Sequence, residues 1–293
     1  MLKTTNSEVI RDTEKIKKIV TKLLLNSDVI GFIPVFKHLH NGYINLFELS
    51  RSKSSITIVI FLNNFIIDKE NNNFVHNLAQ DIEICKNFSV DYIFIPPKKE
   101  FIIDNSCISL NLPPHLGATL SGAFKPEYFS YLITIILKFL NLTRAKYIFV
   151  NEIYWQFITI LRQLIDSFYL PFSIITSPIV RDPSGIAFND NYIQLTPDEK
   201  NIVKFMYESL QFSQALIDRG EDKVSYIRES MEKYLSQQSQ LFIQYIAFVD
   251  PFTLTPITRI TKTTLIEISA YINNINLIDN LLVAPNKQDD LEF

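Results

Sequence analysis

The fold of this chain is decided by residues 31–46, which read GFIPVFKHLHNGYINL. The apolar run over residues 29–36 is broken only by a glycine and a proline, and its length is typical of a buried strand in a parallel sheet. A tight turn at Gly42 follows, and a helical pattern begins at Ile44. We therefore predict a strand, a short loop and the first turn of a helix. In α/β folds such a junction binds phosphate groups, because backbone N–H groups point outward from the start of the helix.

The same alternation of strand and helix continues along the first 180 residues. Short β-branched and aromatic runs predict strands over residues 29–36, 55–62, 91–95, 147–150 and 172–176. Amphipathic or long apolar segments predict helices over residues 7–25, 44–50, 74–88, 126–142 and 154–168. This spacing indicates βαβ units and a parallel sheet with helices on both faces. The predicted fold class is therefore α/β.

The pattern changes after residues 178–185, a turn-rich segment that reads PIVRDPSG and predicts a hinge or domain boundary. Beyond it we predict charged helices over residues 198–218 and 222–237, strands over 242–249 and 277–283, and a further helix over 263–271. These elements would form a small α+β domain. We therefore divide the chain into residues 1–183 and 184–293.

Composition and charge exclude several classes of protein. Of the 293 residues, 47% are hydrophobic and 20% are charged, and the net charge is −3, so the chain can bury a large core but lacks the basic balance of a nucleic-acid binder. No apolar tract reaches the roughly 18 residues of a membrane span. Cys85 and Cys107 have no metal-binding spacing and fit a reducing compartment. We expect no signal peptide, no nucleic-acid or membrane partner, and a cytoplasmic location.

A resemblance to a known family starts in the opening stretch. Residues 40–43, His-Asn-Gly-Tyr, are similar to the His-x-Gly-His signature of the nucleotidyl-transferase superfamily. The whole of residues 31–46 resembles the segment G-[FL]-V-P-T-M-G-x-L-H-x-G-H-x-x-L of pantothenate synthetases (pantoate–β-alanine ligases). Further segments that resemble this family follow in order at residues 60–63, 91–96, 120–126, 180–187, 195–199, 249–251 and 277–280. The resemblance therefore covers nearly the whole chain.

The resemblance implies a Rossmann-like domain that binds a nucleotide, a small C-terminal α+β lid domain and a homodimer. It also implies a two-step reaction in which ATP, with magnesium, adenylates pantoate and releases pyrophosphate, after which the amine of β-alanine attacks the acyl adenylate. Carried onto this chain, it implies nucleotide-binding positions at Pro34, His40, Gly42 and Val180 and a substrate-pocket position at Asn63. His40 is the only catalytic candidate that is retained.

Three replacements affect the catalytic loop and the acid pocket. Tyr43 stands in place of the second histidine of the signature, and a phenol cannot carry positive charge near neutral pH. Ile66 and Phe157 stand in place of the two glutamines that fix the acid substrate in the family. A site that hydrogen-bonds a hydroxy acid would lose both amides, at about 1–3 kcal/mol for each partner left unpaired.

The groups that would contact the nucleotide are also replaced. Ile153 and Tyr154 stand where the family has a lysine for the phosphates and an aspartate for the nucleotide. Residues 189–191, Asn-Asp-Asn, replace the two serines and the arginine of a flexible loop that closes over the triphosphate. Asp190 would repel the phosphates at this place, and the cations that neutralise them are gone.

Scaffold motifs stay legible while site positions have changed, which indicates a retained fold with an altered pocket. Our first hypothesis is a pantothenate synthetase-like protein that has lost most or all of the ligase activity and uses no cofactor. It would serve as a binding or partner subunit, and one candidate for its partner is a paralogous active subunit. The alternative is an active ligase that uses ATP and magnesium, either for pantoate or for a more apolar acid that Ile66 and Phe157 would suit. His38 and His40 lie at alternate positions, but with no third ligand nearby we predict no metal site.

Overall fold

A computed structural model describes residues 7–62, 65, 77–103, 107–125 and 127–285 of the chain. Its N-terminal half is a six-stranded sheet in the order β1-β4-β3-β2-β5-β6, and every pair in it is parallel. The strands are β1 (Glu8–Ile10), β2 (Ile30–Val35), β3 (Ile56–Phe61), β4 (Tyr92–Phe94), β5 (Tyr147–Asn151) and β6 (Ser173–Ser177). The predicted parallel sheet is therefore confirmed.

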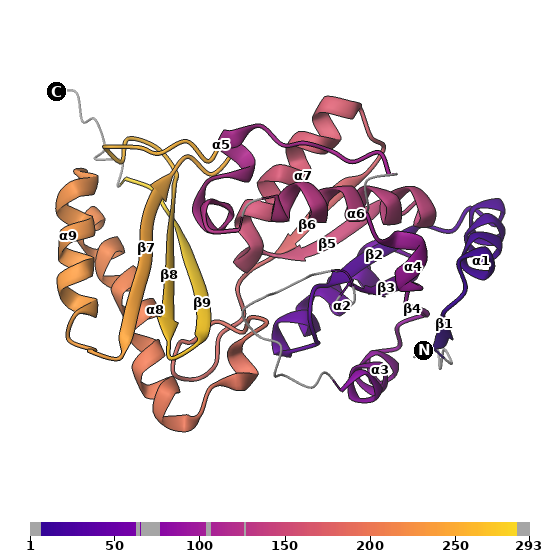
Figure 1. The fold of residues 1–293 in the computed structure, drawn as a ribbon, viewed down its shortest axis with the longest axis horizontal. Coiled ribbons are helices and arrows are strands. Elements are labelled where there is room, and N and C mark those ends of the chain that lie inside the picture. The colour runs from indigo at the N-terminus through magenta and orange to yellow at the C-terminus, as the bar shows by residue number, and fades with distance from the viewer. Residues whose placement is uncertain (1–6, 63–64, 66–76, 104–106, 126, 286–293) are drawn as a thin grey trace, which may run out of the picture.

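Helices cover both faces of this sheet (Figure 1). Helices α1 (Thr13–Leu25), α6 (Tyr128–Thr143) and α7 (Trp155–Phe168) pack on one face, against side chains such as Phe32 and Ile148. Helices α2 (Ile44–Lys53) and α3 (Leu78–Asn87) pack on the other, against neighbours in the same strands such as Ile33 and Phe149. Because successive strand residues point to opposite faces, the continuous apolar runs of the sequence supply both layers. Two one-turn helices, α4 (Lys98–Phe101) and α5 (Pro114–Gly117), lie in the connections.

Gly31 lets helix α2 lie close against the sheet. A Cβ atom at this position would fall 2.5 Å from Ser54 Oγ and 2.7 Å from both Ser50 Oγ and the Phe149 ring. Any other residue would therefore push the helix or the neighbouring strand away.

The C-terminal part is a second, antiparallel sheet with two helices. Strands β7 (Leu241–Val249), β8 (Thr264–Ile272) and β9 (Ile275–Val283) pair in sequence order, with β8 in the centre. Helices α8 (Pro197–Asp218) and α9 (Val224–Leu235) cover one face, and the other face turns toward the parallel-sheet half (Figure 1). The predicted division at residues 183 and 184 falls in the connection between the two sheets and stays a prediction.

Two sequence predictions are wrong. The predicted helix over residues 7–25 begins only at Thr13, where Asp12 caps it by accepting from Lys15 N, and residues 8–10 instead pair with β4 as an edge strand. The predicted helix over residues 263–271 is strand β8. Nearly every residue of β8 is buried because both faces of this central strand are covered. Residues 266–272, Ile-Glu-Ile-Ser-Ala-Tyr-Ile, alternate between apolar side chains packed in the core with α8 and α9 and more polar ones on the other face, which is a strand pattern that the helix prediction missed. The other predicted helices and strands are confirmed, with their ends shifted by a few residues.

A buried ion pair joins the connection after β6 to the second sheet. The Arg181 guanidinium donates to both carboxylate oxygens of Asp279 in β9, at 2.6 and 2.8 Å, and it stacks on the Tyr207 ring at 3.6 Å from the ring centre. In addition, the Trp155 indole and the Thr159 hydroxyl of α7 both donate to the Pro251 carbonyl, each at 2.9 Å. These bonds fix the second sheet over the edge of the first.

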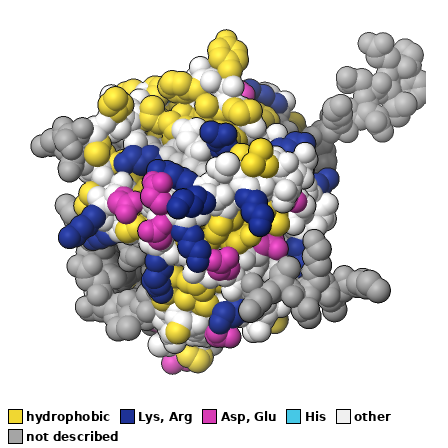
Figure 2. Space-filling model, turned by 90° about the vertical axis from the view of Figure 1, so that its right-hand side faces the viewer, with side chains coloured by type: hydrophobic (Ala, Val, Ile, Leu, Met, Phe, Trp, Pro, Cys, Tyr) yellow, Lys and Arg dark blue, Asp and Glu magenta, His cyan; other side chains and the backbone are white. Residues whose placement is uncertain are grey.

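The surface around α1 shows charges of both signs (Figure 2). On this face lysine and arginine side chains alternate with acidic ones instead of forming one continuous basic surface. Among the described helices, none is both long and apolar enough to cross a bilayer.

Candidate active site

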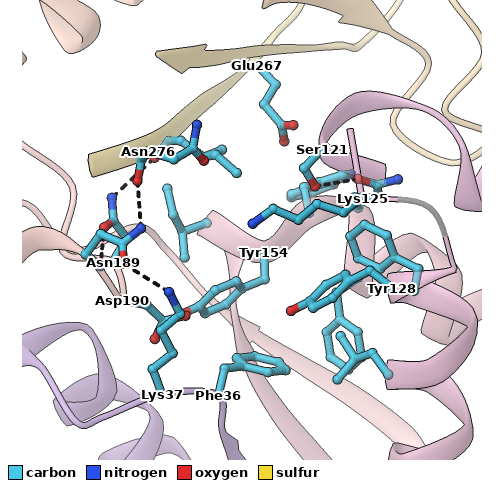
Figure 3. Close-up of a pocket in the computed structure, with 18 residues that line it drawn as sticks. Phe36, Lys37, Ser121, Lys125, Tyr128, Tyr154, Asn189, Asp190, Glu267 and Asn276 are labelled. Atoms are coloured by element: carbon cyan, nitrogen blue, oxygen red, sulfur yellow. Dashed lines mark hydrogen bonds between the residues drawn. The ribbon is translucent and has the colours of Figure 1, made fainter. Parts of the chain in front are cut away.

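The candidate site lies where the order of the strands reverses, between β2 and β5. Ligands of open α/β sheets bind at the carboxyl ends of the strands at such a reversal. Strand β2 pairs with β3 as far as Val35 but with β5 only at Gly31 and Phe32. Pro34 has no N–H group to donate beyond that point, so the two strands separate there. A cavity of about 140 Å³ opens beside this end of the sheet, bounded on its far side by β8 and β9 (Figure 3).

His40 and Gly42 satisfy each other in the loop that follows β2. The Gly42 N–H donates to His40 Nδ1 at 3.1 Å, and His40 is 8% exposed. A Cβ atom at Gly42 would lie 2.7 Å from the imidazole ring, so the contact requires a glycine. Burial, and secondly the neighbouring His38, lower the pKa of His40 to about 3. The imidazole is therefore neutral, and its Nδ1 is already occupied by the N–H group that was expected to face a phosphate.

The remaining predicted nucleotide positions are also set back from the cavity. Pro34 is buried within β2, and Val180 is half-buried with its carbonyl accepting from Phe188 N. None of Pro34, His40, Gly42 and Val180 belongs to the described lining of the cavity. The predicted substrate-pocket residue Asn63 lies outside the described residues, as does the replacement at Ile66.

Three of the replaced positions come together at the base of the cavity. The buried hydroxyl of Tyr43 accepts from the Phe36 N–H at 3.3 Å, and the Tyr154 hydroxyl is buried beside it. Burial first, and then the carboxylate of Asp190, raise the pKa of both phenols well above the usual range. Tyr43, which stands in place of the second histidine, is thus joined by a second neutral phenol and a carboxylate, and none of the three side chains carries positive charge. This group does not fit a triphosphate, which needs positive charge.

An aromatic wall occupies the side where the family pattern holds the acid substrate. Phe36 packs against Tyr154 and Phe157, with ring centres 4.7 and 5.3 Å apart. Ile153 adds an aliphatic side chain to the same lining. The side chains of Phe36, Phe157 and Ile153 offer no hydrogen bond to a hydroxy acid, yet the cavity is open. At about 10–15 Å³ of such volume for one water molecule, it has room for a small organic molecule.

Comparison with known proteins decides the family. The family model described as Pantoate-beta-alanine ligase matches residues 8–282. The chain belongs to this family. The predicted resemblance is therefore confirmed. A pantothenate synthetase of Thermosipho africanus is 30% identical over 94% of this chain and 100% of its own length, and one of Campylobacter hominis is 31% identical over 94% and 99%.

Solved structures of the pantoate–β-alanine ligase family share the fold. The crystal structure of the pantothenate synthetase from Thermus thermophilus superposes with a TM-score of 0.87 at 20% identity, covering 95% of this chain and all of that one. The enzyme from Francisella tularensis, solved with β,γ-ATP and β-alanine, gives a TM-score of 0.74 at 24% identity, covering 94% and 97%. The predicted Rossmann-like sheet with a small C-terminal domain is confirmed by these likenesses.

In this member of the ligase family, the loop with the Asn-Asp-Asn replacement is fastened to both halves. Lys37 Nζ donates to Asn191 Oδ1 at 3.1 Å, and Asn191 Nδ2 donates to the Asn276 carbonyl at 2.7 Å. Lys37 was not predicted as a site residue, although it lies in the opening stretch next to Phe36. Its ammonium group supports this loop on the cavity wall.

Gln156 shapes the opposite side of the cavity. Its carbonyl oxygen accepts from Ser121 Oγ at 2.9 Å and Gly122 N at 3.3 Å, while its amide nitrogen donates to the carbonyls of Leu116 and Thr119 at 3.0 and 2.8 Å. All four hydrogen bonds of this buried amide go to residues 116–122 and hold that one segment in place. That loop brings Ser121 and Lys125 to the cavity.

Besides Lys37, two more charged residues of the cavity were not predicted from the sequence, Lys125 and Glu267. Lys125 stands where the family segment L-x-G-x-x-R-P has its arginine, so this likeness could have identified it. Glu267 was missed because residues 263–271 were predicted as a helix, although the alternation over residues 266–272 puts this glutamate on the more polar face of a strand. Burial, and more weakly the charge of Asp279, raise the pKa of Glu267 to about 7, although a hydrogen bond from Tyr245 opposes the shift.

Proposed function

We propose that this chain has lost most or all of the pantoate–β-alanine ligase reaction of its family and works as a ligand-binding or partner subunit. One observation carries the proposal: where the family pattern has a histidine, a lysine and an arginine, this chain has Tyr43, Ile153 and Asn191, and Asp190 places a carboxylate beside the neutral phenols of Tyr43 and Tyr154. Removing a single group that stabilises developing negative charge often lowers a rate by about 10²–10³. Here the second histidine, the lysine and the arginine of the family pattern are replaced together.

The state of His40 supports the same conclusion. A neutral imidazole that already accepts from Gly42 cannot stabilise a departing pyrophosphate as a cation would. We expect ATP to bind weakly or not at all, with no strong preference for ATP over adenosine, because Tyr43, Ile153 and Asn191 offer no positive charge to the phosphates and Asp190 repels them.

A second function is favoured by the open aromatic cavity. The chain would then be an ATP- and magnesium-dependent ligase for an acid more apolar than pantoate, whose body would lie on Phe36 and Phe157. The wall made of these two rings supports such an acid, but the group at Asp190 argues against the nucleotide that the reaction needs.

ATP–pyrophosphate exchange separates the two functions. The purified protein is assayed with magnesium and a panel of acids that includes pantoate and several larger apolar acids, beside the Thermosipho africanus relative as the positive control. We expect no exchange with any acid, and calorimetry should show equally weak binding of ATP and adenosine. Acid-dependent exchange, or a micromolar dissociation constant for ATP that is lost in His40→Ala, would refute the loss of ligation. Exchange with an apolar acid would establish the second function, and exchange with pantoate would establish the reaction of the family.

We further propose that the chain forms a homodimer in the cytoplasm, in line with what its family resemblance implies, and that a paralogous active subunit is a candidate partner. Sedimentation at micromolar concentration tests the first point directly. A monomer under these conditions would refute it.

A further inference from the structure

Glu267 presents a buried carboxylate to the cavity from the middle of strand β8 (Figure 3). The residue is 2% exposed, and the Tyr245 hydroxyl donates to its Oε1 at 2.7 Å. It takes part in none of the ion pairs found among the described residues. A carboxylate can accept about four hydrogen bonds, so this group retains capacity for a donor in the cavity.

A buried carboxylate such as that of Glu267 destabilises the fold unless it binds a partner. Burying an acid without a cation is unfavourable, and the fold could have placed an apolar residue in the centre of this sheet instead. Perturbed acids that line a cavity are typical of ligand sites. The partner that would satisfy Glu267 best is an ammonium group, which donates three hydrogen bonds and carries the opposite charge.

The same cavity also carries a cation. Lys125 and Ser121 belong to the loop that Gln156 holds, and Figure 3 shows the Lys125 side chain extending into the cavity on the side facing Glu267. A ligand that reaches Glu267 with an ammonium group can therefore meet Lys125 with an anionic one. The cavity lining also includes the aromatic side chains of Phe36, Phe129 and Phe157.

We propose that the cavity binds an amino acid with an apolar side chain, with its ammonium group on Glu267, its carboxylate on Lys125, and its side chain on the wall of Phe36, Phe129 and Phe157. The assignment names the ligand of the binding function proposed above and rests on it. β-Alanine differs from such a ligand because it has no side chain to cover the aromatic wall.

Calorimetric titration at pH 8 with four probes tests this assignment. L-Phenylalanine should bind, while phenethylamine lacks the carboxylate, 3-phenylpropionate lacks the ammonium group and β-alanine lacks the side chain. We expect each of these three to bind at least tenfold more weakly than L-phenylalanine. Binding of β-alanine or 3-phenylpropionate as tight as that of L-phenylalanine would overturn the proposal.

Two variants give a crossed pattern that misfolding cannot produce. Glu267→Gln should weaken the binding of L-phenylalanine at least tenfold and leave the affinity for 3-phenylpropionate unchanged. Lys125→Met should weaken the binding of L-phenylalanine and leave the affinity for phenethylamine unchanged. Glu229→Gln, in an exposed position of α9, serves as the control and should change none of them. The assignment would be refuted if Glu267→Gln and Lys125→Met both lowered the affinity for every probe equally, or if neither variant lowered any affinity.

The pH dependence offers an independent readout. Tyr245 from β7 and Asp279 from β9, with its partner Arg181, act on Glu267 from the neighbouring strands, and the charged residues Lys37, Lys125 and Asp190 line the same cavity. Tyr245 stays neutral, because burial raises its pKa well above the usual range. With the Glu267 pKa at about 7, L-phenylalanine should bind about tenfold more tightly at pH 8 than at pH 6, and Glu267→Gln should remove this difference.

The outcomes distinguish this inference from the loss of ligation. Absence of both pyrophosphate exchange and amino-acid binding would refute only the ligand assigned here. Exchange that depends on an acid would refute the loss of ligation, whatever the cavity binds.

Discussion

Replacing Glu267 by glutamine should stabilise the protein at high pH. Burial raises the pKa of this carboxyl in the folded protein to about 7, against 4.5 as its ordinary value. The fold therefore favours the protonated form, and its contribution to the free energy of unfolding is fully present below pH 4.5 and is lost as the pH rises through 7. A difference of 2.5 in pKa, at about 1.36 kcal/mol for each unit, corresponds to about 3 kcal/mol.

Urea unfolding of the wild type and of Glu267→Gln at pH 5 and pH 8 measures this contribution. The glutamine is neutral at both pH values. The free energy of unfolding of the variant, relative to that of the wild type, should therefore be about 2–3 kcal/mol higher at pH 8 than at pH 5. Glu229→Gln should behave like the wild type, because this side chain is exposed. If Glu267→Gln and the wild type change in parallel from pH 5 to pH 8, the carboxyl is not held in its protonated form and the reasoning fails.

Arg181→Met should lower the free energy of unfolding by about 3–5 kcal/mol, because it leaves a buried carboxylate without its partner. Arg259→Met breaks an exposed pair and should lower it by only about 0–1 kcal/mol. Similar losses for the two variants in urea unfolding would contradict this prediction. Gly31→Ala should cost about 1–3 kcal/mol by the same measurement, since its Cβ has no room, and an unchanged midpoint would show that α2 can move aside. Limited proteolysis should first cut residues 180–192, as expected of the predicted domain boundary, and early cleavage within β5 would argue against that boundary.

Local patterns in the sequence were enough to predict the parallel sheet. The strands β2, β3 and β5 are short apolar runs bounded by turn residues, and the helices between them have one apolar face, so each element could be recognised without its neighbours. The edge strand β1 could not be recognised, because it is too short to show a pattern and exists only because β4 pairs with it. The central strand β8 was missed although residues 266–272 alternate between apolar and more polar side chains, as a strand with two different faces does.

The candidate site divides in the same way. The sequence placed the loop at His40 and Gly42 after a strand and showed that Tyr43, Tyr154 and Asp190 depart from the family pattern, because these are statements about residue type at a position. It could not show that His40 and Gly42 satisfy each other, which depends on the loop geometry. Nor could it show that the three replaced residues meet, since their charges interact only through the fold.

The sequence by itself thus determined the class of fold, the family, and the residues at which this chain departs from the family pattern. Tertiary structure decided how those residues are arranged and what surrounds them. Glu267 and Lys125 are separated by more than a hundred residues. Glu267 lies on β8 of the antiparallel sheet and Lys125 in the loop before α6, and only the packing of β8 over the reversal point of the parallel sheet brings them to one cavity. The physical reason is that burial sets the cost and the pKa of a charge, and burial is a property of the assembled chain.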